Sequence, residues 1–145
     1  MTDPADVKAG LLSTVQRVMA LCTDLLDVVP SAAHSIGGDS VPRVAGVYIF
    51  RFLANEEPAY VGRAIGEEGL YQRIVTQHLR PSYRKSVFRI AIAKDTAVGT
   101  GGESVDFILQ RFSLAFVECP NDSPAVIKAA EALLIAALKP KYNKD

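Results

Sequence analysis

Apolar side chains recur at helical spacing along the first part of the chain. Intervals of three or four residues separate the members of one set: Val7, Leu11, Val15, Val18, Cys22, Leu25 and Val29. A flanking row widens the apolar face: Leu12, Met19 and Leu26. The pattern predicts one long amphipathic helix over residues 4–29. Residues 30–40 contain Pro30 and a Gly-Gly pair, which predicts a linker.

A second strongly periodic segment lies near the other end. Residues 124–138 carry a core-facing apolar stripe, and Ser123 and Pro124 suit the N-cap and the first helical position. Lys128 and Glu131 are the only charged residues of this predicted helix. Because they stand three residues apart, a surface ion pair between them is one explanation of Glu131.

Alternating apolar and polar positions predict strands in the middle of the chain. Residues 45–52 alternate and are rich in β-formers, and residues 59–62 form a second short run. The segment between them, residues 53–58, has turn chemistry. The hairpin that follows from this pattern places Tyr48 and Tyr60 on adjacent antiparallel strands.

Three helices and a third strand complete the predicted fold. A helix over residues 70–79 carries Arg73 and His78, and it ends before Pro81. Residues 84–94 fit a strand and a helix almost equally, and we favour a helix because Ser86 is a suitable cap. A short helix over residues 104–110 and a strand over residues 111–118 follow.

These elements predict an α+β fold with a small three-stranded antiparallel sheet flanked by helices. Residues 1–40 form an added helix with its linker, and residues 41–145 form the main domain. A length of 145 residues suits this division.

Composition excludes several classes of protein. No apolar run reaches the ~18 residues of a membrane span, and no signal segment opens the chain. Cys22 and Cys119 lack the spacing of a zinc site. We therefore expect buried free thiols, a reducing compartment and a cytoplasmic location.

Charge is zero overall but unevenly distributed. Residues 1–40 carry a net charge of −3, whereas residues 63–94 hold seven basic and two acidic side chains, a net charge of +5. A local basic face is what contact with nucleic-acid phosphates requires, although such clusters are as often solvated surface. The residues expected to bind nucleic acid are Arg63, Arg80, Arg84, Lys85 and Arg89.

Two tripeptides on the predicted hairpin are informative together. The sequences G-V-Y at 46–48 and Y-V-G at 60–62 resemble the paired signature of the GIY-YIG endonucleases. The resemblance extends to three further positions: Arg73, Glu131 and Asn143. The ending K-P-K-Y-N is very like the end of the nuclease domain in the bacterial excision-repair incision subunit, and homing endonucleases share the signature. The match covers residues 44–143, with a small insertion at residues 65–68.

The resemblance implies hydrolysis of phosphodiester bonds in DNA, with RNA not excluded, and Mg²⁺ or Mn²⁺ as cofactor. It implies that Glu131 binds the metal, since one carboxylate with several waters suits Mg²⁺. Arg73 would hold the phosphate bidentately. Tyr48 would orient the attacking water or take its proton, and Tyr60 is a second phenol aimed at the same site.

Four further residues have expected roles in this site. His78 would accept a proton or touch a phosphate, and the plainer reading is a hydrogen-bonded surface histidine. Asn143 would anchor the chain end within the site. Gly46 and Gly62 are expected as structural residues of the site, because a side chain at Gly62 would obstruct a close approach.

Two other classes of function stay open. The first is a catalytically weak or inactive nucleic-acid-binding module of the same fold. The second is an interaction protein whose N-terminal helix is the working part. That helix is expected either to pack across its own domain or to mediate a homodimer.

Overall fold

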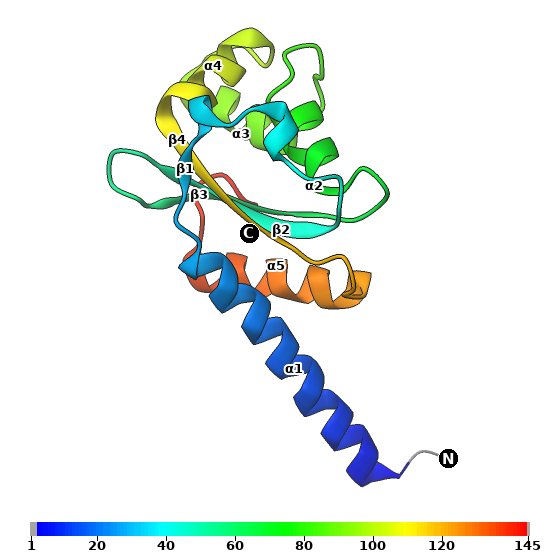
Figure 1. Cartoon of the computed structure of the whole chain (residues 1–145). Helices are drawn as coiled ribbons and strands as arrows, with labels where there is room; N and C mark the ends of the chain where they lie inside the picture. The colour runs from blue at the N-terminus through cyan, green and yellow to red at the C-terminus, as the bar shows by residue number, and fades with distance from the viewer. Residues whose placement is uncertain (1–2, 145) are drawn as a thin grey trace.

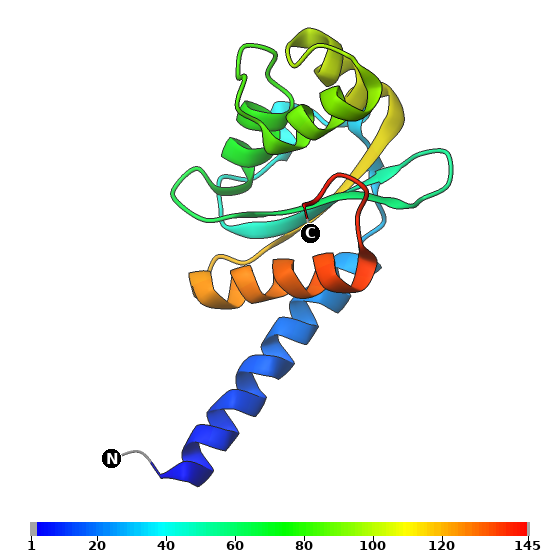
Figure 2. The ribbon, with the colours of Figure 1, turned by 180° about the vertical axis from the view of Figure 1, so that it is seen from behind.

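The computed structural model describes residues 3–144, and within them an antiparallel sheet of four strands lies between two groups of helices (Figures 1 and 2). The elements follow in the order α1 (Pro4–Asp27), β1 (Ser31–Ala32), η1 (Ala33–Ser35), η2 (Gly38–Ser40), β2 (Gly46–Phe52), β3 (Pro58–Ala64), α2 (Gly69–Tyr71), η3 (Gln72–His78), α3 (Val87–Thr96), α4 (Gly102–Arg111), β4 (Phe112–Glu118) and α5 (Pro124–Leu138).

The sheet has the strand order β1-β4-β2-β3, so β2 is central and β3 is an edge. Successive side chains of a strand point to opposite faces, and β2 follows this rule. Tyr48 and Phe50 belong to the core beneath η3, α3 and α4. Val47 and Ile49 belong to a second core with α1 and α5. The sheet is therefore the middle of three layers.

The predicted α+β class is confirmed, and the predicted number of three strands is wrong. The segment expected to be a linker contains β1, whose Ser31 lies opposite Leu114 of β4. Ala33, directly after β1, is fully buried in the same core as Tyr48 and Phe50. A strand of two residues is too short to show alternation, which explains why the pattern did not reveal it.

The helix expected over residues 70–79 is not a regular α-helix. After the single turn of α2, η3 is a wide π-helical segment in which the amide of Leu79 donates to the carbonyl of Ile74 at 3.1 Å. The core side of α2 and η3 is formed by Leu70, Ile74 and His78, which are all buried. π-helical turns are rare and often occur at functional sites.

Helices α3 and α5 and strand β4 match their predicted segments closely. The hydroxyl of Ser86 caps α3 by accepting the amide of Arg89, and the hydroxyl of Ser123 caps α5 by accepting the amide of Val126. These caps satisfy backbone donors that lack a partner within the helix.

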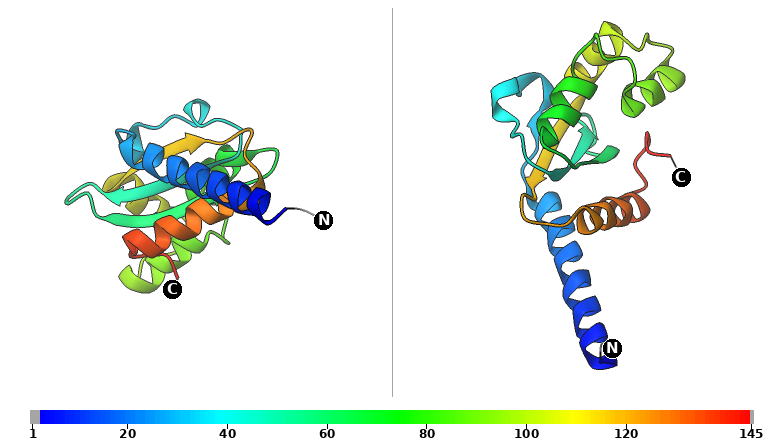
Figure 3. Two further views of the ribbon diagram at one scale, coloured as in Figure 1. Left: turned by 90° about the horizontal axis from the view of Figure 1, so that it is seen from below. Right: turned by 90° about the vertical axis from the view of Figure 1, so that its right-hand side faces the viewer.

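The long helix α1 is only half covered. Val18, Leu21, Cys22 and Leu25 in its C-terminal half are buried against α5 and the sheet, whereas residues 3–17 are all exposed. Figures 1 and 3 show this N-terminal half extending away from the rest of the chain. Packing across its own domain therefore describes half of the helix, and the structure gives the predicted homodimer no support.

Two further expectations concern the surroundings of the chain. None of the helices among the described residues is both long enough and apolar enough to cross a membrane. Cys22 and Cys119 are buried and free.

Candidate active site

The phenol of Tyr48 lies directly over Gly62 of the edge strand. The two residues are paired across β2 and β3. A Cβ atom on Gly62 would stand 2.3 Å from both Cζ and Oη of Tyr48, so a side chain there would force the phenol to move. Gly46 is needed for a different reason, because its Cβ would stand 2.3 Å from the carbonyl oxygen of Val117. Gly62 thus lets a residue of the central strand reach the sheet edge.

A buried chain of hydrogen bonds starts at this phenol. Tyr48 Oη lies 2.7 Å from Nε2 of His78, and Nδ1 of His78 lies 2.7 Å from Oγ of Ser86. All three residues are at most 1% exposed. In the tautomer that donates Nδ1–H to Ser86, Nε2 is free to accept the proton of Tyr48. The expectation of a surface histidine at position 78 is therefore wrong.

Burial sets the protonation of both groups. Burial raises the pKa of Tyr48 well above its usual value of 10, and the nearby Tyr60 adds to the effect. Burial lowers the pKa of His78 to about 3, helped by the positive charges of Arg73 and Arg89. At neutral pH the pair is a neutral phenol beside a neutral imidazole.

Tyr60 and Arg73 stand beside this pair. The Tyr60 ring stacks on Phe88 with a centroid distance of 4.6 Å, and its centroid lies 5.4 Å from that of His78. Arg73 is half-buried and donates from Nη1 to Oε1 of Gln77 at 3.3 Å. Its charge opposes the rise in the pKa of both tyrosines, so it lies within electrostatic reach of both hydroxyls.

Glu131 approaches from the other face of the sheet, where α5 packs. Its Oε1 lies 2.5 Å from Nη1 of Arg63 on β3, so its observed ion pair is with Arg63 rather than with Lys128. The Glu131 side chain is 15% exposed, and it lines an open pocket of about 610 Å³. Its negative charge contributes to the raised pKa of Tyr48 and of Tyr60. The carboxylate and the two phenols are therefore neighbours.

Glu131 fits the demands of a hard divalent cation. Among residues 3–144 no group of three or more histidine, cysteine or acidic side chains is placed to share an ion. One carboxylate beside an open pocket suits Mg²⁺, which keeps much of its water shell and takes few protein ligands. Arg63 pairs with Oε1 of the same carboxylate, so a cation bound there would share Glu131 with this guanidinium or displace it.

The C-terminal tail closes one side of the site. Asn143 acts like an added strand residue, because its side-chain Oδ1 accepts the amide of Val61 and its Nδ2 donates to the carbonyl of Val61, both at 2.8 Å. The amide of Tyr142 donates to the carbonyl of Ala59 at 2.8 Å. The tail is thereby fixed along the free edge of β3.

The five basic residues expected to bind nucleic acid fall into three groups. Arg80, Arg84 and Lys85 are exposed on the loop between η3 and α3, as that role requires. Arg63 is engaged with Glu131. Arg89 is only 1% exposed, so its prediction as a phosphate contact is wrong.

Arg89 instead links η3, α3 and α4 to one another, in the layer of helices that covers the Tyr48 face of the sheet. Its Nε donates to Oγ of Ser104 at 2.9 Å. Its two terminal nitrogens donate to six backbone carbonyls, those of Gln77, Arg80, Pro81, Tyr83, Thr100 and Gly101. Ser86 is the other residue whose role the sequence did not reveal, since it was expected only as a helix cap. Arg89 shares a face of α3 with the apolar residues Phe88 and Ile92, and this position is the sequence signal that could have indicated its burial.

Comparison with known proteins finds similarity among solved structures. No family model matches this chain, and no curated protein matches it. The solved structures similar to it include GIY-YIG endonuclease domains. Three are point mutants of the N-terminal endonuclease domain of UvrC from Thermotoga maritima, each bound to its catalytic divalent cation. Identities are 23%, 25% and 26%, and TM-scores are 0.43, 0.44 and 0.44. Each alignment covers 73% of this chain and 89% of the other.

Proposed function

We propose that this chain is a divalent-metal-dependent endonuclease that hydrolyses phosphodiester bonds in DNA. The observation that carries the proposal is the 2.7 Å hydrogen bond between Tyr48 and a neutral buried His78, within the electrostatic reach of Arg73 and Glu131. Phosphodiester hydrolysis needs an activated water, neutralisation of charge on the phosphate and help for the departing oxygen. This cluster offers a group for each task.

Activation of water uses the phenol and the imidazole in series. A free phenol is a weak base because it is protonated at neutral pH. In the proposed step Tyr48 Oη takes a proton from the attacking water while its own proton passes to Nε2 of His78. The resulting hydroxide attacks phosphorus and the 3′ oxygen departs. Ser86 holds the imidazole in the tautomer whose Nε2 accepts. Burial and the positive charges of Arg73 and Arg89 disfavour the imidazolium, so its proton passes back through Tyr48 to the departing 3′ oxygen, which leaves as an alcohol.

Arg73 and Glu131 act on the phosphate side of the reaction. The guanidinium of Arg73 binds two phosphate oxygens and gains strength as negative charge develops. Glu131 is the residue that would hold the divalent cation, which supplies Lewis-acid stabilisation of the phosphate and of the leaving oxygen when it is bound. The exposed Arg80, Arg84 and Lys85 bind flanking phosphates of the substrate.

One pair of observations favours a second candidate, a nucleic-acid-binding module that does not cut. Arg63 already occupies an oxygen of Glu131, and Tyr48 is only 1% exposed. A site locked in this form would bind nucleic acid through its basic residues without completing the reaction.

Plasmid nicking separates the two candidates. Wild-type protein is incubated with supercoiled DNA, and in parallel with a labelled RNA, in Mg²⁺, Mn²⁺ or EDTA. We expect nicking only with a divalent ion, and a loss of about 100-fold or more in Tyr48→Phe, which keeps the ring and removes the hydroxyl. Tyr83→Phe on the exposed loop is the matched control. Tight binding without metal-dependent nicking would instead establish the non-cutting module.

A further inference from the structure

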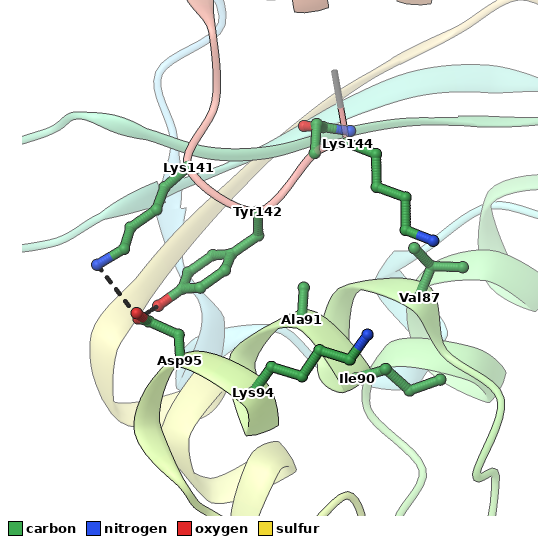
Figure 4. A pocket seen from close by; sticks show the side chains of 9 residues that line it. Val87, Ile90, Ala91, Lys94, Asp95, Lys141, Tyr142 and Lys144 are labelled. Carbon is green, nitrogen blue, oxygen red and sulfur yellow. Dashed lines mark hydrogen bonds and ion pairs between the residues drawn. The ribbon is translucent and has the colours of Figure 1, made fainter.

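A second cavity lies on the other side of the C-terminal tail from Glu131. It has a volume of about 410 Å³ and opens between α3 and the tail (Figure 4). Its floor is apolar, formed by Val87, Ile90 and Ala91, and Val87 is 49% exposed. Three lysines line it: Lys94 from α3, and Lys141 and Lys144 from the tail. Figure 4 shows the amino groups of Lys94 and Lys144 turned toward the space between these elements.

Among the described residues that line this cavity, three are lysines and one is an aspartate, so their net charge is positive. Asp95 accepts a hydrogen bond from Tyr142 Oη at 2.9 Å and pairs with Lys141 Nζ at 3.2 Å. These two partners lower the pKa of Asp95, the Tyr142 hydrogen bond contributing most. Asp95 is thus committed to the rim, and Figure 4 shows Lys141 turned toward it and away from Lys94 and Lys144.

The tail wall of the cavity is hydrogen-bonded to β3 and is continuous with the candidate active site. Tyr142 is 5% exposed and fixed to β3 through its backbone, and Asn143 is fixed to Val61 through its side chain. Asn143 and Lys144 line both this cavity and the pocket beside Glu131. An extended ligand that passes over Lys144 would therefore contact both this cavity and the pocket beside Glu131.

We propose that this cavity binds one unpaired nucleotide of the substrate strand, next to the phosphate that is cut. The inference rests on the proposed function and adds to it a class of substrate. The base lies against Val87, Ile90 and Ala91, and the adjoining phosphates contact Lys94 and Lys144. The cavity is near the lower end of the range for sites that hold one small ligand, so it fits a single nucleotide rather than a base pair. The preferred substrate is accordingly single-stranded or unpaired at this position.

Binding is tested in EDTA, where no cutting occurs, by the fluorescence anisotropy of a labelled ten-nucleotide single strand and of its blunt duplex. Lys94→Ala and Lys144→Ala should each weaken single-strand binding by about threefold or more. Together they should lower the salt slope by about 1.4, since each phosphate contact on a single strand contributes about 0.7. Ala91→Phe fills the floor without a change in charge, and it should weaken single-strand binding about fivefold while the salt slope stays unchanged.

Lys8→Ala on the protruding half of α1 is the matched control, because it removes the same charge far from the cavity. Circular dichroism establishes that each variant is folded. The proposal is overturned if Lys8→Ala weakens binding as much as Lys94→Ala, if Ala91→Phe binds the single strand as wild type does, or if the duplex binds as tightly as the single strand. A wild-type chain that binds through this cavity and never cuts would refute the proposed hydrolysis alone.

Discussion

Replacement of Arg89 by methionine tests how much the hydrogen bonds of this buried guanidinium contribute to the free energy of unfolding. The methionine keeps much of the apolar length of the side chain and removes all of its donors. The buried guanidinium donates to one hydroxyl and to six carbonyls: that of Gln77 in η3, three in the loop at residues 80–83 and two in the loop at residues 100–101. Burial lowers the pKa of Arg89, and the charge of Arg84 adds to this effect. The carbonyls are thus the groups that stabilise the buried cation.

The expected cost follows from the groups left behind. A hydrogen bond to a charged partner contributes roughly 1.5–3 kcal/mol, and an interior carbonyl without a partner is costly. If two of the six carbonyls stay unsatisfied after relaxation, Arg89→Met loses about 3–5 kcal/mol, a large share of the ~5–15 kcal/mol typical of a domain. Arg89→Lys should fall in between, because a lysine keeps the charge and cannot reproduce the planar fork.

Urea unfolding followed by circular dichroism measures these differences. Arg84→Met is the control, since Arg84 is exposed five residues away, and its effect should stay within about 0.5 kcal/mol. A loss below about 1 kcal/mol in Arg89→Met would refute the view that this guanidinium organises both loops.

Three further predictions address the rest of the molecule. Gly62→Ala should destabilise the fold by about 1–3 kcal/mol and abolish nicking, because the added Cβ displaces the phenol of Tyr48. Gly37→Ala, which has open space around it, should do neither, and equal effects of the two variants would contradict the reasoning. In the folded state the pKa of His78 is depressed, so the unfolded chain binds the proton first as the pH falls. The free energy of unfolding should therefore fall as pH drops from about 6.5 toward about 3, by up to ~1.4 kcal/mol per pH unit. If the free energy of unfolding of His78→Asn has the same slope against pH, His78 is excluded as the cause. Deletion of residues 1–16 should change the free energy of unfolding by at most about 0.5 kcal/mol, since that part of α1 is exposed, whereas Leu21→Ala in the buried part should cost about 2–5 kcal/mol. If the deletion instead causes a loss of stability that depends on protein concentration, and the full chain sediments as a dimer, the exposed half of α1 serves self-association.

The fold was predictable where the pattern is long. The alternation in residues 45–52 and the helical spacing in residues 124–138 each extend over enough positions to identify β2 and α5. β1 has two residues, too few for any periodicity. The wide turn of η3 was equally hidden, because apolar residues at helical spacing over residues 70–79 do not distinguish a π-helix from an α-helix.

The candidate site was predictable as a set of residues and not as a set of contacts. The paired tripeptides drew attention to Tyr48 and Glu131, but hydrogen bonds between distant positions depend on the folded chain. Tyr48 and His78 are 30 residues apart, and Arg63 and Glu131 are 68 apart. The interior place of Arg89 was missed because it sits in a segment rich in exposed basic residues.

The central claim is that Glu131 holds the metal for hydrolysis, and the single-turnover rate of DNA cleavage as a function of Mg²⁺ concentration tests it most directly. Glu131→Gln preserves the shape of the side chain and removes its charge, and Glu57→Gln in the exposed hairpin turn is the control. We expect Glu131→Gln to cut at least about 100-fold more slowly at every Mg²⁺ concentration, with DNA binding retained and Glu57→Gln unchanged. Arg63→Met should reach half-maximal rate at about 2–5-fold less Mg²⁺, because it removes a competing ion pair of roughly 0.5–1 kcal/mol. Cleavage by Glu131→Gln within about threefold of wild type, with the same Mg²⁺ dependence, would contradict the assignment.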